Sequence, residues 1–303
     1  MKNSKMKKIS KQLTTLFFAL SCTLSTFGGD NPQAYIIFNS QGEKVSFEQM
    51  IETVFRKNVV LFGEIHNCPI CHWLEAETMK QLHALHGKKL LLGAEMFESD
   101  NQLILNEFMK GKISKSSFES EMRLWKNYST DYAQLVEYAK EHKVPFYATN
   151  IPRRYAQIVA LKGLDGLDAL SDEAKKYIAP LPIPYVVDSA TTAMFGTMTA
   201  QMGHSSRNPE FMSQAQSIKD ATMAWTISQA FVENPDSSFL HFHGSFHSDH
   251  YGGIIPFLMK YNSRLSVATI SCCRQKDLSQ LEEEHIGKAD FIICIPEDMV
   301  NSY

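Results

Sequence analysis

Short apolar runs that alternate with longer helical patterns constrain this chain more than any other feature. Seven runs have the length of a strand, and most are continuous, as expected for strands that are covered on both faces. Between them lie stretches with the apolar spacing of helices, such as 71–86, 130–141 and 214–232. This alternation predicts an α/β fold in which a mostly parallel sheet is flanked by helices. The expected strands are 34–38, 58–62, 89–94, 144–148, 238–242, 265–271 and 290–295.

The segment 152–237 contains no convincing strand and is broken by Pro180, Pro182 and Pro184. We interpret it as a helical cap subdomain that is inserted before the later strands, over an edge of the sheet. With 303 residues, of which 44% are hydrophobic, the chain can bury one large core. We therefore expect one α/β domain over residues 34–303, with a helical insertion at about 152–237.

Residues 1–21 have the pattern of a secretory signal peptide. They carry five lysines and no acidic residue, and their apolar run at 13–20 is too short to span a bilayer. The residues Ala19-Leu20-Ser21-Cys22 are similar to a bacterial lipobox, which predicts that Cys22 becomes the lipid-modified first residue of the mature chain. Residues 22–33 would then form a tether. An ordinary signal-peptidase cut before Cys22 and an uncleaved anchor are the alternatives.

The charge of the chain is unevenly distributed. The formal net charge is −3, from 30 basic and 33 acidic residues. Removing the five lysines of the signal region leaves 25 basic residues against the same 33 acidic ones, so the remaining body carries −8. This acidic body has no dense stripe of Lys and Arg, which argues against a nucleic acid as the partner.

Polar residues follow four of the expected strands at the point where each strand ends. Because the carboxyl ends of parallel strands meet at one edge of a sheet, where ligands of open α/β sheets bind, we expect these side chains to share one crevice. A buried Glu95 would be costly without a partner, and we expect Arg153 or a histidine in that role. The residues at these strand ends are Glu64, His66, Glu95, Arg153 and His247.

One helix is expected to join this crevice. Gln216 and Asp220 lie one helical turn apart, and Met223 follows on the same face. These three side chains would project together toward the strand ends. A helix that turns this polar face to solvent is the alternative.

The sequence Cys68-Pro69-Ile70-Cys71-His72 matches the C-x-x-C-H pattern of c-type haem attachment. In that interpretation both thiols bond the haem vinyl groups and the histidine ligates the iron. A labile disulfide or metal-binding pair, and a pair of inert thiols at the start of a helix, are the alternatives. The other cysteines of the body, which we interpret as buried free thiols, are Cys272, Cys273 and Cys294.

These motifs, taken together and in order, resemble a known family. The set is similar to that of the ChaN-like haem-binding lipoproteins, which belong to a superfamily that includes the Tiki proteases and the erythromycin esterases. The family commonly has an Asp where this chain has Asn67, and paired histidines where it has Cys71-His72. The matching motifs, spread through most of residues 35–295, are Gly63-Glu64-Ile65-His66 with Pro69 and His72, Glu95, Asn150-x-Pro152-Arg153, Gln216-x-x-x-Asp220-x-x-Met223-Ala224 and Gly244-x-x-His247.

The resemblance implies an α/β body with a helical subdomain and a lipid anchor in the bacterial outer membrane, on its periplasmic or its surface face. It also implies a role in iron or haem uptake together with transport components. The resemblance further implies a homodimer that encloses two stacked haems, with a tyrosine as the iron ligand and polar side chains on the propionates. The candidate tyrosines here are Tyr147, Tyr155, Tyr185 and Tyr251.

The first function that follows is a lipid-anchored haem-binding protein of a bacterial iron or haem uptake system. It would carry non-covalent haem as cargo, and chelatase activity is left open. A purely structural lipoprotein is a further interpretation, but it leaves the four polar strand ends unexplained. The expected pocket residues are Glu64, His66, Glu95, Arg153, Gln216, Asp220, Met223 and His247.

The alternative function is a metal-dependent or metal-free hydrolase of the Tiki or erythromycin esterase type. In it Glu64, His66, Glu95 and His247 would act as acid and base, or would hold a divalent metal that activates water. The sequence has no Gly-x-Ser-x-Gly motif, so a serine nucleophile of that kind is not expected. The candidate metal ligands are His66, His72, Glu95 and His247.

Overall fold

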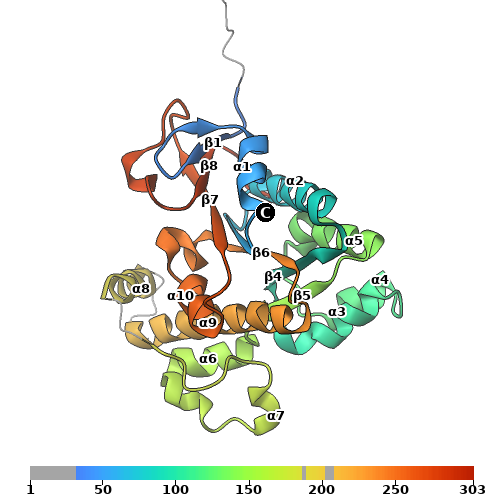
Figure 1. Ribbon diagram of the computed structural model, residues 1–303. Helices are drawn as coiled ribbons and strands as arrows, with labels where there is room; N and C mark the ends of the chain where they lie inside the picture. The colour runs from blue at the N-terminus through green and yellow to red at the C-terminus, as the bar shows by residue number, and fades with distance from the viewer. Residues whose placement is uncertain (1–31, 186–188, 202–207) are drawn as a thin grey trace, which may run out of the picture. The chain divides into compact units, whose positions relative to one another are not determined.

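A sheet of eight strands, in the order β2-β1-β8-β7-β3-β6-β4-β5, lies at the centre of the fold (Figure 1). The computed structural model describes residues 32–185, 189–201 and 208–303. All seven strands expected from the sequence are present, and β2 is an additional strand of two residues. The strands are β1 (Ile36–Asn39), β2 (Lys44–Val45), β3 (Val59–Glu64), β4 (Leu90–Glu98), β5 (Phe146–Asn150), β6 (Ser238–Gly244), β7 (Val267–Gln275) and β8 (Phe291–Pro296).

The sheet is mostly parallel, as the sequence predicts. β3 pairs in parallel with β6 and β7, β4 pairs in parallel with β5 and β6, and β7 pairs in parallel with β8. β1 is antiparallel to its neighbours β2 and β8. Every residue of β3, with the sequence VVLFGE, is buried, which explains why this strand lacks the alternation of a half-exposed strand.

Helices cover both faces of the sheet. Val60 and Phe62 of β3 belong to a core that they share with α1, α2 and α5, whereas Val59 and Leu61 pack with α9 and α10 on the opposite face. The helices of the described residues are α1 (Phe47–Val54), α2 (Pro69–His86), α3 (Gln102–Met109), α4 (Lys115–Glu121), α5 (Ala133–His142), α6 (Arg153–Lys162), α7 (Asp172–Lys175), α8 (Ser189–Gln201), α9 (Pro209–Glu233) and α10 (Ile254–Tyr261).

Between β5 and β6 the described residues form helices and no strand. Ile151, Val159, Ile178 and Ile218 lie in a core of their own within this segment. Helix α9 reaches from this separate core to the sheet. Its 25 residues span about 37 Å, and its later turns, at Ile227, pack on the sheet. The segment is therefore more than the cap over a sheet edge that the sequence suggested, since its last helix also covers one face of the sheet.

The expected signal peptide, Cys22 and the tether up to residue 31 lie outside the described residues. Within the described ranges, no helix has both the length and the hydropathy that a membrane span requires.

Candidate functional site

The polar strand ends meet at one edge of the sheet. β3, β6, β4 and β5 are consecutive neighbours, and Glu64 lies opposite Gly244 in the register of β3 and β6. Glu95 directly follows the last residue of β4 that pairs with β6. The side chains form two groups, which we call the His247 cluster (Glu95, Asp220 and His247) and the Glu64 cluster (Glu64, His66, His72, Glu75 and Tyr132).

In the His247 cluster an imidazole lies between two buried carboxylates. His247 Nε2 is 3.1 Å from Glu95 Oε1, and His247 Nδ1 contacts Asp220 Oδ1. Burial lowers the pKa of His247, but the charges of Glu95 and Asp220 outweigh this effect and raise the pKa to about 10. The same pairing holds the pKa of Glu95 well below its ordinary value, although burial alone would raise it. His247 is therefore an imidazolium and Glu95 a carboxylate at neutral pH.

Helix α9 brings Gln216 and Asp220 to this cluster together. The side-chain nitrogen of Gln216 lies 3.0 Å from each ring nitrogen of His247. Met223, however, is fully buried and packs with Val59 and Leu61 in the core beneath the sheet. The expected trio is divided because α9 has already passed onto the sheet at the turn that carries Met223.

In the Glu64 cluster one buried carboxylate receives three polar contacts. Glu64 Oε1 accepts hydrogen bonds from the Tyr132 hydroxyl at 2.7 Å and from His66 Nδ1 at 2.6 Å. Glu64 Oε2 is 3.0 Å from His72 Nδ1. Burial raises the pKa of Glu64, but the hydrogen bonds with His66 and His72 outweigh it and lower the pKa to about 2. Glu64 is therefore ionised at neutral pH.

His72 faces the interior from the first turn of α2. Pro69 occupies a first-turn position of this helix, where its missing N–H removes no helical hydrogen bond. His72 Nδ1 lies 3.2 Å from Glu75 Oε2, one helical turn further along. The ligand atoms of Glu64, His72 and Glu75 all lie within 4.8 Å of one another, which is close enough for them to bind one metal ion.

The metal ligands expected from the sequence do not form one centre. His72 contacts Glu64 and Glu75, whereas His247 contacts Glu95 and Asp220. The two histidines therefore belong to different clusters, because one lies in the helix after β3 and the other in the turn after β6.

His66 connects the two clusters and is the most accessible of these groups, with 41% of its side chain exposed. Its ring packs directly on Gly244, since a Cβ atom added there would lie 2.7 Å from two ring atoms. Trp125 contacts the ring edge-on, with the centroids 5.0 Å apart. Burial lowers the pKa of His66, but the hydrogen bond to Glu64 and the charges of Glu95 and Glu64 outweigh it and raise the pKa.

His66 and Glu95 line a cavity of about 520 Å³, which we call the smaller cavity. Three cationic side chains, Lys126, Arg153 and Lys219, line it as well. Arg153 forms its ion pair with Glu98 of β4, and not with Glu95. Of the two partners expected for Glu95, the histidine is thus the one found, and Arg153 contributes positive charge at the wall.

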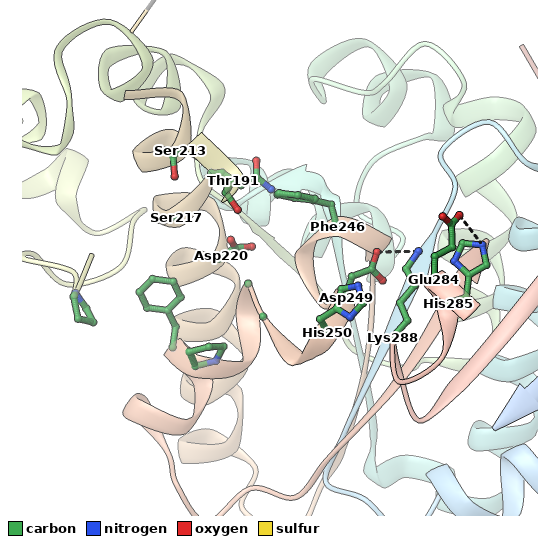
Figure 2. A pocket seen from close by; sticks show the side chains of 16 residues that line it. Thr191, Ser213, Ser217, Asp220, Phe246, Asp249, His250, Glu284, His285 and Lys288 are labelled. Carbon is green, nitrogen blue, oxygen red and sulfur yellow. Dashed lines mark ion pairs between the residues drawn. The ribbon is translucent and has the colours of Figure 1, made fainter. Parts of the chain in front are cut away.

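A larger cavity of about 920 Å³ is lined by Asp220 of the His247 cluster (Figure 2). α9 lines one wall with Gln216, Ser217 and Asp220, and the segment after β6 faces it with Asp249 and His250. Further lining residues are Phe246, Pro256, Phe257, Glu284, His285 and Lys288. Asp220 lines this cavity and Glu95 lines the smaller one, so the His247 cluster separates the two.

The family described as "Haem-binding uptake, Tiki superfamily, ChaN" matches residues 50–258. The chain belongs to this family. Among solved structures, the ChaN protein of Campylobacter jejuni, which binds haem cofacially, superposes with a TM-score of 0.65 at 16% identity over 86% of this chain and 97% of that one. An erythromycin esterase, EreC, gives a TM-score of 0.49 at 9% identity over 87% and 98%. No curated protein matches. The expected family and its α/β fold are confirmed.

The four candidate tyrosines of this ChaN-family chain lie in different places. Tyr147 bonds Asn234 and lines a separate cavity with Lys140 and Lys143. The Tyr155 hydroxyl accepts a hydrogen bond from Arg154. Tyr185 donates to Ser213, which lines the larger cavity, and Tyr251 lies between the cavity residues His250 and Gly252. Tyr251 itself does not line the larger cavity, and its hydroxyl donates a hydrogen bond to Asp290 at 3.1 Å.

The thiols of the C-x-x-C-H sequence do not face a ligand site. Cys68 and Cys71 are fully buried in the core and form no disulfide with any described cysteine. Cys272, Cys273 and Cys294 are buried free thiols as well, and Cys273 Sγ lies 3.0 Å from Cys294 Sγ. The contact with Cys71 and burial raise the pKa of Cys68, and burial raises the pKa of Cys71. This geometry opposes the interpretation as a covalent haem site and agrees with inert thiols at a helix start.

Two residues of the Glu64 cluster were not expected from the sequence. Glu75 follows His72 by one helical turn, so an H-x-x-E pattern on the expected helix could have indicated it. Tyr132 lies 68 residues from Glu64, in a π-helical turn before α5, and no local pattern predicts its contact.

Proposed function

We propose that this chain is a lipid-anchored haem-binding protein of a bacterial iron or haem uptake system. The observation that supports this best is the larger cavity, whose volume of about 920 Å³ suits a cofactor-sized ligand. Its wall joins the apolar Phe246, Pro256 and Phe257 to polar groups on α9. Membership of the haem-binding ChaN family supports haem as the ligand. Cofacial binding by the Campylobacter jejuni protein supports a homodimer that encloses two stacked haems.

Within this proposal, Tyr251 is the iron ligand. It is 42% exposed, and its neighbours His250 and Gly252 line the larger cavity. Its hydroxyl donates to Asp290 at 3.1 Å, and this hydrogen bond would have to be exchanged for the bond to iron. His250 and Tyr251 have φ angles of 54° and 58°, an uncommon conformation that concentrates at functional sites. Because the body carries −8, the haem propionates need local cations, and Lys288 of the same wall, which pairs with Asp249 at 3.2 Å, is the one proposed here.

Titration of haem into the purified apo-protein tests this proposal. We expect a saturable Soret shift, which is displaced and weakened in Tyr251→Phe. Tyr147→Phe is the matched control, since Tyr147 lines a different cavity. Absence of a saturable shift at micromolar haem would overturn haem binding, and a Tyr251→Phe spectrum identical to the wild type would overturn the iron ligand.

Export, lipidation of Cys22 and an outer-membrane location are part of the same proposal. In the bacterial host, Cys22→Ala should abolish incorporation of labelled palmitate and release the protein from the outer-membrane fraction. A variant that remains in that fraction would contradict the lipid anchor.

A second candidate function, acid–base hydrolysis, is favoured by the smaller cavity. There the half-exposed His66 is bonded to an ionised Glu64 and faces a cavity that three cations line. This arrangement can move a proton to or from an anionic ester without a serine nucleophile. His66→Asn should abolish hydrolysis of an anionic test ester, and release of iron from bound haem can be followed in the same variant. Wild-type protein that lacks both activities would exclude this function.

A further inference from the structure

The inner side of the Glu64 cluster is a place where ligand atoms converge away from both cavities. Glu64 and His72 are 2% exposed and Glu75 is fully buried. We propose that these three side chains bind one divalent metal ion with the nitrogen–oxygen preference of zinc, cobalt or manganese. The proposal does not depend on haem binding, and its ligands differ from the set of catalytic candidates except for Glu64.

The distances suit a shared ion. His72 Nδ1 lies 3.0 Å from Glu64 Oε2 and 3.2 Å from Glu75 Oε2. Ligand atoms at bonds of about 2.1 Å are separated by about 3.0–3.4 Å in octahedral and tetrahedral sites. His72 Nδ1 is therefore at this spacing from both carboxylate oxygens, and the ligand atoms of all three residues lie within 4.8 Å of one another.

The surroundings of His72 match those of a metal-binding histidine. Such a histidine typically donates its second ring N–H to a carbonyl or a carboxylate, which fixes the tautomer. His72 Nε2 lies 3.3 Å from the His66 carbonyl oxygen and 3.5 Å from Asp131 Oδ2. Asp131 is itself held by Asn127 at 2.7 Å and by Ser302 at 2.8 Å. Nδ1 is thereby left to face the two glutamates.

One buried oxygen supports the site independently of the spacing. Within the part of the chain that the structure describes, Glu75 Oε1 accepts no hydrogen bond, and the polar contact of Glu64 Oε2 is the ring nitrogen of His72. With Asp131, three buried carboxyl groups surround a single imidazole, and uncompensated buried charge is costly. Either His72 is an imidazolium and one glutamate holds a proton, in line with the raised pKa values of His72 and Glu75, or a divalent ion replaces these protons and balances the charge. The ion accounts for both the charge and the ligand spacing.

The ion would act as a positioning element for the site. It would fix Glu64 Oε2, while Glu64 Oε1 remains bonded to Tyr132 and His66. Glu64 thus links a buried ion to the exposed His66 ring, which lines the smaller cavity.

The experiment compares metal content and thermal stability in the full-length protein. Each protein is unfolded with guanidinium and EDTA, refolded with Zn²⁺, Co²⁺ or Mn²⁺ so that the ion can enter, and dialysed without chelator. Elemental analysis and thermal denaturation follow. The variants are Glu75→Gln and His72→Gln, and Glu77→Gln is the control because Glu77 lies on the same helix but at the surface.

We expect about one retained ion per chain and a metal-dependent rise in Tm for the wild type and Glu77→Gln. Both site variants should retain less than about a tenth of that ion and show no metal-dependent rise. Refolded wild type without retained metal or a Tm response would overturn the proposal, since a shared proton then balances the charge. A site variant that keeps the ion would also overturn it. If the protein retains the metal ion but does not bind haem, the proposed function is contradicted and the metal site is not.

Discussion

Replacing Gly244 by Ala tests how the His66 ring is held. The backbone at this position has φ −61° and ψ 138°, which alanine adopts without strain. The added methyl group, however, would lie 2.7 Å from His66 Cε1 and Nε2, about 1 Å inside an ordinary carbon contact. The ring must move by about that distance. This movement breaks its 2.6 Å hydrogen bond to Glu64.

The magnitude follows from the exposure of His66. Because 41% of the side chain is exposed, the ring can turn toward solvent without distorting the sheet. The main loss is one hydrogen bond to a charged group, about 1.5–3 kcal/mol, which solvent screening reduces to about 1–2 kcal/mol. The hydrogen bond to Glu64 also helps to raise the pKa of His66, so this pKa should fall toward its ordinary value of 6.5.

Histidine NMR titration and urea denaturation measure these two effects. Gly196→Ala is the control, because among the described residues the nearest atom to its added Cβ is Pro209 Cγ at 3.6 Å, and alanine favours the helix. Gly244→Ala should lower both the His66 pKa and the unfolding free energy, and Gly196→Ala should lower neither. A Gly244→Ala protein with unchanged His66 pKa and stability would refute the packing argument.

Three further changes test other parts of the site. Asp220→Asn removes one of the anions that raise the His247 pKa to about 10 from 6.5. Protonated His247 contributes its full stabilisation below about pH 6.5, and this contribution is lost as the pH rises through about 10. Urea denaturation from pH 6 to 10 should therefore show a smaller decline of the unfolding free energy in the variant than in the wild type. An equal decline would contradict the pairing. Tyr132→Phe removes a donor to buried Glu64 and should cost about 1.5–3 kcal/mol in guanidinium denaturation, and a neutral change would contradict the bond. Met223→Ala should cost about 2–5 kcal/mol while haem affinity stays unchanged, whereas reduced affinity with unchanged stability would place Met223 in the pocket.

The sheet could be predicted from the sequence because each strand is defined by a local pattern. The run Val59–Glu64 is apolar until its last residue, and the structure buries all of it. The same locality made the strand ends predictable, since parallel order alone brings Glu64 and Glu95 to one edge. The spacing of Gln216 and Asp220 was sufficient to place both beside His247, because one helical turn separates them.

What could not be predicted depends on how distant segments pack. The contact between Tyr132 and Glu64 requires α5 to lie against α2, which no local pattern encodes. Met223 shares the helical face of Asp220 in the sequence, but it meets the sheet and not the cavity because α9 crosses from one to the other. The sequence allowed either Arg153 or a histidine as the partner of Glu95. Because Arg153 pairs with Glu98, the partner of Glu95 is a histidine.

The arrangement of the cavities makes the two proposed functions experimentally separable. Lys288 and the sequence neighbours of Tyr251 line the larger cavity, whereas His66 and the cationic wall belong to the smaller one. His247 and its two carboxylates lie between them. Tyr251→Phe should therefore weaken haem binding and leave ester hydrolysis intact, and His66→Asn should do the opposite. Loss of both functions in each single variant, with the fold preserved, would mean that one continuous site serves both, and the separation by His247 would have to be abandoned.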